Sequence, residues 1–536
     1  MNNTPRPLPI PKYEPKPRPD YAPRDTLFAY LCIPVCYLLV KSAPLSSPTL
    51  GTALSFALIA AFSLFYLLLS GTRPSPASWM IWLIILALCA GFVTNASRVL
   101  RTLLSLVLPL ILLIFAHTCC KKDFFAGLSQ NPLGSMAGAL ITAPFASLDQ
   151  NIVVFLPTKK GKKSGFLSAL GWCLVGLAGA IIPTVIVIGL LSYDAQFTNL
   201  LENIFEALDD IFSFSKQNLF EQVGDVILAC LFGIALCAIL FGNLVAARPQ
   251  NKPTTEAEDV DKKPTLQVLP KPLLAAFITP VLLIYVLFFV SQWNYYVSAF
   301  TNTLPEGLTY AQYAREGFFQ LCTVSVFNAV LLFVLQAFMR RTPGERGLLR
   351  RTYAGIVSLF TLILIATALS KMMLYIDAYG MTQNRILATW MILLLAVIFI
   401  LSLLHVFCKK FPLAIGVFIT CALFLLILFL PNVDGMIADY NVDAYLSGDL
   451  SSVDVEALQD LDLAAVPALS RLEEHLLSQP SLDEKSAALL EETTAQLDRL
   501  AEQSNNADNG IFDFNIPLSR ARQMLAKRQP KGVLYE

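Results

Sequence analysis

The chain has 536 residues, of which 55% are hydrophobic and only 15% are charged, and its 39 basic residues equal its 39 acidic residues. Its mean hydropathy of +0.60 is far above that of soluble domains. This composition excludes a soluble globular protein, and the balanced charge gives no reason to expect a nucleic-acid partner. We therefore expect an integral membrane protein surrounded by membrane lipids.

Residues 1–25 form a polar, proline-rich arm without the apolar core that a secretory signal needs. The stretch RPLPIPKYEPKPRPDYAP predicts an extended, disordered segment. We interpret this arm as a cytoplasmic tether. Binding to a domain that recognises PxxP motifs is the alternative.

Residues 26–430 contain repeated apolar stretches of roughly the 20 residues that a helix needs to cross a bilayer. We expect an all-α, polytopic domain with about eleven transmembrane helices. The predicted spans are 26–41, 51–70, 78–95, 99–117, 166–192, 222–247, 270–291, 317–339, 352–376, 386–407 and 411–430. The first is the weakest, because it is short and contains Pro34.

Basic residues collect in the connections that follow the fourth, eighth and tenth spans, which predicts that these connections are cytoplasmic. They are Lys121, Lys122, Lys159, Lys160, Lys162, Lys163, Arg340, Arg341, Arg346, Arg350, Arg351, Lys409 and Lys410. The loop at 193–221 is acidic, as an outside loop can be. An odd number of spans then places the N-terminus in the cytoplasm and the C-terminus outside.

Three connections differ from simple loops. Residues 131–158 are interrupted by Gly, Pro, Ser and Asp, and we expect short amphipathic helices there in the cytoplasmic interface. Residues 196–215 repeat apolar side chains at helical spacing and should lie along the outer interface. Residues 248–270 are polar and proline-rich, which predicts a cytoplasmic linker.

From residue 431 the chain becomes polar, and it is strongly acidic as far as residue 510. Gly448 interrupts the helical periodicity, and Pro467 suits a first helical turn. Residues 480–503 and 516–528 predict two further helices. We expect residues 431–536 to form a small acidic, all-helical module outside the membrane, suited to interaction or packing rather than to catalysis.

Polar residues gather at the outer ends of the eighth, ninth and tenth spans. The predicted cluster comprises Tyr313, Arg315, Glu316, Lys371, Tyr375, Asp377, Tyr379 and Arg385. Thr309 and Gln312 have the spacing of a capping box, so a helix should begin there and enter the membrane. In the following hairpin, Gly380 should end one helix and Thr382 can cap the next.

This cluster has three interpretations, because an intramembrane lysine such as Lys371 costs roughly 2.5–3.5 kcal/mol unless it is compensated. In the first, Glu316 and Asp377 pair with the basic residues and lock three spans together. In the second, the basic residues bind an anion, such as a lipid phosphate or an acidic solute group. In the third, Glu316 and Lys371 couple proton or ion movement.

The sequence contains no motif typical of an enzyme: it lacks H-E-x-x-H, Walker A, G-x-S-x-G and an Asp-rich metal pair. The stretch HTCC at 117–120 does not match a standard zinc spacing. We predict no catalytic residue, no metal and no cofactor. The favoured function is a cell-envelope scaffold or sensor that contacts other envelope proteins through its C-terminal module. A secondary transporter of an anionic solute or lipid is the alternative.

Several segments resemble an uncharacterised bacterial multi-pass membrane family, the domain of unknown function numbered 4153, together with its close relative numbered 4173. The segments are LLSYDAQF at 190–197, YAREGFFQL at 313–321, SKMMLYIDAYGMTQNR at 370–385, and YNVDAYLSGDL with AAVPAL in the tail. The likeness covers most of residues 25–470. It implies a bacterial cell membrane location and a tail that continues the membrane domain as one unit. It carries over no catalytic residue.

Overall fold

The computed structural model describes residues 23–42, 48–71, 73–120, 124–125, 128, 135–136, 138–142, 236, 271–291, 310–338, 348–408, 411–450, 452–481, 483–505 and 511–527. Helices are the only regular secondary structure in these residues. The chain divides into two compact units, Met1–Tyr37 with Ala143–Arg248, and Leu38–Thr142 with Pro249–Glu536. Of the first unit, only the start of α1 (Pro23–Ser42) and Leu236 are described.

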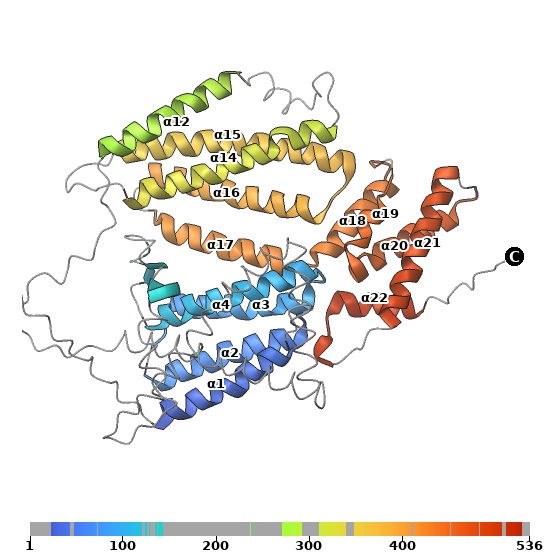
Figure 1. Cartoon of the computed structure of the whole chain (residues 1–536), viewed down its shortest axis with the longest axis horizontal. Helices are drawn as coiled ribbons and strands as arrows, with labels where there is room; N and C mark the ends of the chain where they lie inside the picture. The colour runs from blue at the N-terminus through green and yellow to red at the C-terminus, as the bar shows by residue number, and fades with distance from the viewer. Residues whose placement is uncertain are drawn as a thin grey trace, which may run out of the picture. The chain divides into compact units, whose positions relative to one another are not determined.

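Three antiparallel helices open the second unit: α2 (Leu50–Leu69), α3 (Pro76–Thr94) and α4 (Arg98–Cys120). α3 begins at a proline, and the Ser75 side chain accepts a hydrogen bond from the Ser78 amide, which is a favourable helix start. The Trp82 indole N–H donates to the Ala60 carbonyl over 3.3 Å and holds α3 against α2. Figure 1 shows the three helices side by side.

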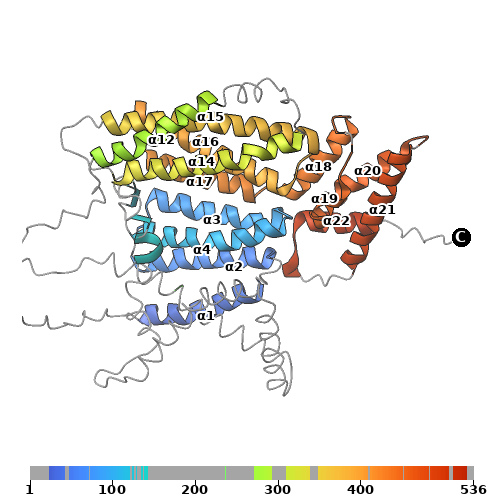
Figure 2. The ribbon, with the colours of Figure 1, turned by 45° about the horizontal axis from the view of Figure 1, so that its top comes forward.

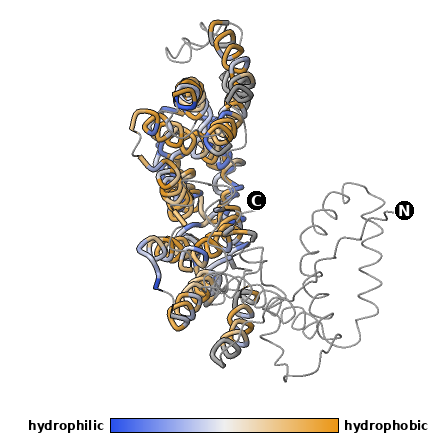
Figure 3. Tube along the Cα trace, turned by 90° about the vertical axis from the view of Figure 1, so that its left-hand side faces the viewer, coloured by the Kyte–Doolittle hydropathy of each residue, from blue (hydrophilic) through white to orange (hydrophobic). Residues whose placement is uncertain are grey.

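A second group contains α12 (Lys271–Ser291), α14 (Tyr310–Phe338), α15 (Leu348–Tyr379), α16 (Gln383–Phe407) and α17 (Leu413–Phe429). Figure 3 looks along the helices and shows that most of the described helical segments are hydrophobic (orange). The Tyr285 hydroxyl donates to Asn328 Oδ1 over 2.7 Å, and Asn328 Nδ2 donates to Thr361 Oγ1 over 2.9 Å. This chain of hydrogen bonds joins α12, α14 and α15 within an apolar core and so favours one alignment of the three helices.

The two groups meet where α17 packs on α3. A β-carbon at Gly91 would lie 2.7 Å from the Phe429 carbonyl oxygen, so the absence of a side chain permits the close approach. The Thr94 hydroxyl donates to the Leu430 carbonyl over 2.6 Å at the same crossing. The C-terminal ends of α3 and α17 are therefore held side by side at one face of the bundle.

The chain bends by 64° between α17 and α18 (Val433–Leu446). The remaining helices are α19 (Val455–Gln459), η2 (Asp462–Ala465), α20 (Val466–Ser478), α21 (Glu484–Asn505), η3 (Ile511–Asp513) and α22 (Ile516–Ala526). We call α18 to α22 the C-terminal helices (Figure 2). α20 packs on α18, α21 and α22, and it buries Leu469, Leu472 and Leu476 at helical spacing.

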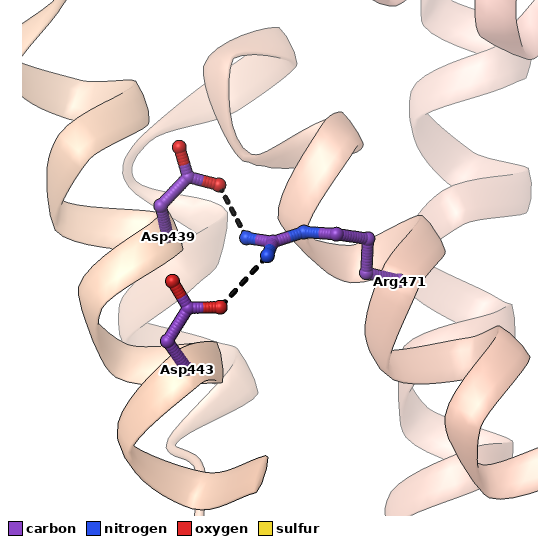
Figure 4. A network of polar contacts seen from close by, with 3 residues as sticks. All are labelled: Asp439, Asp443 and Arg471. Atoms are coloured by element: carbon purple, nitrogen blue, oxygen red, sulfur yellow. Dashed lines mark hydrogen bonds and ion pairs between the residues drawn. The ribbon is translucent and has the colours of Figure 1, made fainter. Parts of the chain in front are cut away.

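Arg471 of α20 connects two carboxylates of α18 (Figure 4). Its Nη1 donates to Asp443 Oδ1 over 2.7 Å and its Nη2 to Asp439 Oδ1 over 2.6 Å. All three side chains are about half exposed, so each pair contributes roughly 0–1 kcal/mol. The contact orients α20 on α18 more than it stabilises the fold.

Five described helices are long and apolar enough to cross a membrane, namely α2, α3, α4, α15 and α16, and α17 with α18 could make a sixth span. These helices indicate a membrane protein, but the count of about eleven spans is not confirmed. Two predicted spans, 166–192 and 222–247, lie outside the described residues apart from Leu236, and the other nine fall on described helices. In α1 the described apolar stretch is only Phe28–Tyr37.

The other sequence predictions have mixed outcomes. The predicted helices at 480–503 and 516–528 correspond to α21 and α22, and Pro467 lies in the first turn of α20. In the predicted interfacial stretch 131–158, the structure describes a short π-helix, η1 (Gly138–Thr142), and Ser135–Met136. The stretch 196–215 and the linker 248–270 lie outside the described residues, as do residues 1–22 of the arm.

Candidate functional site: a buried polar junction

Several of the described helix ends lie together at one face of the second unit. Because consecutive helices run antiparallel, α2, α4 and α16 begin at this face, and α3, α15 and α17 end there (Figure 1). Buried and half-buried polar side chains fill the space between these ends and the C-terminal helices. We call this set the polar junction; it comprises Asn95, Ser97, Arg101, Gln383, Asn432, Asp434, Asn441 and Asn515.

Arg101 lies in the first turn of α4 and is only 3% exposed. Its guanidinium donates to three main-chain carbonyl groups, those of Pro48 (2.8 Å), Ala96 (3.2 Å) and Ser97 (3.4 Å). The rigid fork of donors in arginine suits such a set of acceptors. Arg101 thereby ties the start of α4 to the residues that precede α2.

Asp434 lies at the start of α18, beyond the end of α17, and is also 3% exposed. Its Oδ1 accepts a hydrogen bond from Gln383 Nε2 over 2.9 Å, and the Ser97 side chain also donates to it. Burial raises the pKa of the Asp434 carboxyl from 3.8 to about 6, although these two hydrogen bonds and the nearby Arg101 charge oppose the rise. A carboxyl group with this pKa loses its proton around pH 6 instead of near pH 4.

The raised pKa predicts a pH dependence of stability. The folded state binds the Asp434 proton more tightly than the unfolded chain, so stability falls as pH rises from 3.8 through about 6. The fall attributable to this carboxyl is on the order of 3 kcal/mol. Asp434→Asn should remove that part of the fall while keeping the acceptor for Gln383. Thermal unfolding in detergent at pH 4.5 and 7.5 would measure the difference between the two proteins.

The matched control for this prediction is Asp439→Asn. Asp439 lies on the same helix, but its side chain is 53% exposed and paired with Arg471. This variant should keep the pH dependence of the unmodified protein. If Asp434→Asn kept it as well, Asp434 would not be the titrating group.

Asn441 of α18 binds the turn between α15 and α16 with both ends of its amide. Its Oδ1 accepts from the Met381 amide over 2.6 Å, and its Nδ2 donates to the Met381 carbonyl over 2.8 Å. Gly380 makes the turn possible with a φ of +74°, in the left-handed region that favours glycine. The stretches YGMTQNR and YNVDAYLSGDL therefore contact each other directly.

Asparagines join the break between α3 and α4 to the end of α17 and to the C-terminal helices. Asn95 Nδ2 donates to the Phe429 carbonyl over 3.3 Å, and Asn432 Oδ1 accepts from the Ala96 amide over 3.2 Å. Asn515 caps α22 and donates through Nδ2 to the carbonyls of Phe92 (3.0 Å) and Asn95 (2.8 Å). Each of these contacts satisfies a main-chain group that a helix end leaves without a helical partner.

The structure brings three residues of the predicted cluster together. The Arg385 guanidinium lies 4.0 Å from the centre of the Tyr375 ring, and the Tyr375 and Tyr379 rings are 5.4 Å apart. Arg385 Nη1 donates to the carbonyls of Tyr379 (2.9 Å) and Gly380. Thr382 occupies the N-cap position of α16, as predicted, but its side chain makes no capping hydrogen bond.

The other predicted residues are more dispersed. Lys371 is fully buried in α15, whereas Asp377 is exposed near the end of that helix. α14 begins at Tyr310, beside the predicted capping box, but the side chains of Tyr313, Arg315 and Glu316 lie outside the described residues. Pairing of Glu316 with a basic residue therefore stays a prediction.

Asp377 lines a recess of about 600 Å³ between the end of α15 and α18. The other lining residues are Tyr440, Asp443, Ala444, Ser447, Asp449 and Leu450. Burial and the carboxylates of Asp377 and Asp449 raise the pKa of the Tyr440 hydroxyl. The negative charge of this recess disfavours an anion inside it, so an anion site beside Arg385 or Lys371 would have to lie elsewhere.

Sequence reasoning missed most of the polar junction. The one signal in the sequence was Arg101, which lies in the first turn of a predicted span, at the end assigned to the outside. Basic residues at span ends are usually found on the cytoplasmic side. Asp434, Asn441 and Asn515 gave no comparable signal, because single polar residues at helix ends are common on any surface.

A family model described as a domain of unknown function (DUF4153) matches residues 80–472, which is more than half of the chain. The match begins within α3 and ends within α20, so it includes every residue of the polar junction except Asn515. Searches of curated proteins and of solved structures found no match. The chain belongs to the DUF4153 family.

Proposed function

We propose that the protein is a cell-envelope scaffold or sensor whose membrane helices hold the C-terminal helices in a fixed position outside the cell membrane. The polar junction is the observation that carries this proposal. Asn441 and Asn515 of the C-terminal segment satisfy main-chain groups of Met381, Phe92 and Asn95, and Gln383 satisfies Asp434. Separation of the two parts would leave these polar groups without partners, which favours a rigid attachment.

The distribution of basic residues supports the outside location. Lys121 follows the end of α4, Arg350 and Arg351 lie near the start of α15, and Lys409 and Lys410 connect α16 to α17. The end of α4, the start of α15 and the end of α16 all lie at the face opposite to the polar junction, and these basic residues are next to them in the sequence. Since short cytoplasmic connections carry the excess of Lys and Arg, the junction and the C-terminal helices belong outside.

Reporter fusions test the orientation. Alkaline phosphatase fused after Glu536 should be active, because it folds only outside the cytoplasm, and a green fluorescent protein fused at the same residue should be dark. The reverse pattern would place the C-terminal helices in the cytoplasm and overturn the proposal.

Photo-crosslinking in intact cells tests the scaffold role. α21 presents exposed carboxylates, at Glu484, Glu491, Glu492, Asp498 and Glu502. A photoreactive residue at Glu491 should form adducts with a defined envelope protein, and one at the buried Leu497 should not. The yield from position 491 should fall when Asn441→Ala loosens the junction. Absence of adducts from exposed α21 positions, together with a harmless deletion of the C-terminal helices, would contradict the role.

One observation favours transport as a second candidate. The chain breaks by 64° between α17 and α18, and the buried carboxyl of Asp434 lies at this break. Discontinuous helices with polar groups at the break line the binding sites of many transporters. Uptake of an anionic solute into proteoliposomes that Asp434→Asn abolishes would favour this candidate over the scaffold.

A further inference from the structure

Three large apolar side chains are exposed close together in the last described segment. Phe512 is 63% exposed, Phe514 45% and Ile516 37%. Phe512 lies in η3, Ile516 starts α22, and Phe514 lies between these two elements. Exposed apolar residues clustered in so short a segment indicate an interaction surface.

Hydrogen bonds fix this segment at the ends of two apolar helices. The Phe512 carbonyl accepts from Thr49 Oγ1 over 2.9 Å, and the Phe514 carbonyl accepts from the Leu50 amide over 3.3 Å. Asn515 binds the end of α3 through the Phe92 and Asn95 carbonyls. Since α2 and α3 are both long and apolar enough to cross a membrane, a bilayer crossed by these two helices would have the edge of its hydrocarbon core near this segment.

The segment is hydrogen-bonded to the start of α2, and α2 has an exposed apolar face. Leu54 (53%), Leu58 (41%) and Phe65 (59%) are exposed at helical spacing on α2, as side chains that face lipid are. Leu50, which binds the Phe514 carbonyl, lies one turn before Leu54. Arg520 is exposed one turn after Ile516, and a long basic side chain of this kind can reach lipid phosphates.

We propose that residues 512–516 are an interfacial lipid anchor. Phe512, Phe514 and Ile516 insert among the lipids beside α2 and fix the start of α22 to the membrane surface. Phe is among the residues typical of apolar faces that are buried in the interfacial region of a bilayer. The anchor makes lipid a direct partner of the C-terminal helices. This proposal does not depend on the scaffold role, or on the side of the membrane on which the C-terminal helices lie.

Lipid photo-crosslinking on the full-length protein tests the anchor. Benzoylphenylalanine replaces Phe512 or Phe514 in separate variants, which are reconstituted in phosphatidylethanolamine–phosphatidylglycerol vesicles that carry an alkyne tag on the acyl chain. Leu58 on α2 serves as the position that contacts lipid. The control is Leu477 of α20, which is equally apolar and 53% exposed, on a helix that packs mainly on other C-terminal helices.

We expect lipid adducts at positions 512 and 514 at a yield close to that at 58 and about tenfold above that at 477. Yields at both positions no higher than at 477 would overturn the proposal. Adducts with a second copy of the chain or with another segment of it, in place of lipid, would overturn it too. Testing two positions guards against one variant that fails to fold, which size-exclusion chromatography reports. The vesicles contain no other protein, so the result does not depend on the scaffold role.

Discussion

Arg101→Met is expected to lower the free energy of unfolding by about 3–5 kcal/mol, because breaking a buried charged network leaves its partners unsatisfied. The substitution removes the donors that serve the carbonyls of Pro48, Ala96 and Ser97, and it removes the positive charge near the buried Asp434. Methionine fills a similar volume, so the loss reports on polar contacts more than on packing. Denaturant unfolding in detergent, followed by tryptophan fluorescence, would measure it.

Arg98→Met is the matched control for this experiment. Arg98 starts the same helix, but its side chain is 68% exposed and lies 3.9 Å from Asp462. An exposed pair of this kind contributes roughly 0–1 kcal/mol. Equal losses from the two variants would show that burial of Arg101 has no special importance.

Gly380→Ala is expected to lower the free energy of unfolding by about 2–4 kcal/mol, from a strained backbone and a broken hydrogen-bond pair. The φ of +74° is unfavourable for alanine, and the new β-carbon would lie 2.5 Å from Asn441 Oδ1. Asn441 cannot move away without losing both bonds to Met381. The same denaturant titration measures the loss.

Two comparisons isolate the cause of that loss. Gly355→Ala adds a methyl group inside α15, where the nearest atom is 3.6 Å away, and it should change stability by less than about 1 kcal/mol. In an Asn441→Ala background, Gly380→Ala should cost less than it does alone, because the collision is gone and the two residues are in contact. Strictly additive losses would contradict the contact between residue 380 and Asn441.

The local features of the α15–α16 hairpin were predictable from sequence. Gly380 ends α15, and Thr382 takes the N-cap position of α16, because glycine tolerates a positive φ and helix starts favour Thr. The hydrogen bonds of Arg385 were not predictable: it donates to the Tyr379 and Gly380 carbonyls and stacks on Tyr375. Charge and spacing show where an arginine lies but not which acceptors the folded chain offers it.

The sequence by itself determined that the protein is helical, that it contains apolar helices long enough to cross a membrane, and where several of them begin and end. These properties depend on hydropathy over about 20 neighbouring residues and on local backbone preferences. Only the tertiary structure decided which polar groups meet at the ends of those helices. Asn95 and Phe429 are 334 positions apart, and Asn515 and Phe92 are 423 apart. Such pairings arise when packed helices bring distant ends together, and no local pattern in the chain encodes them.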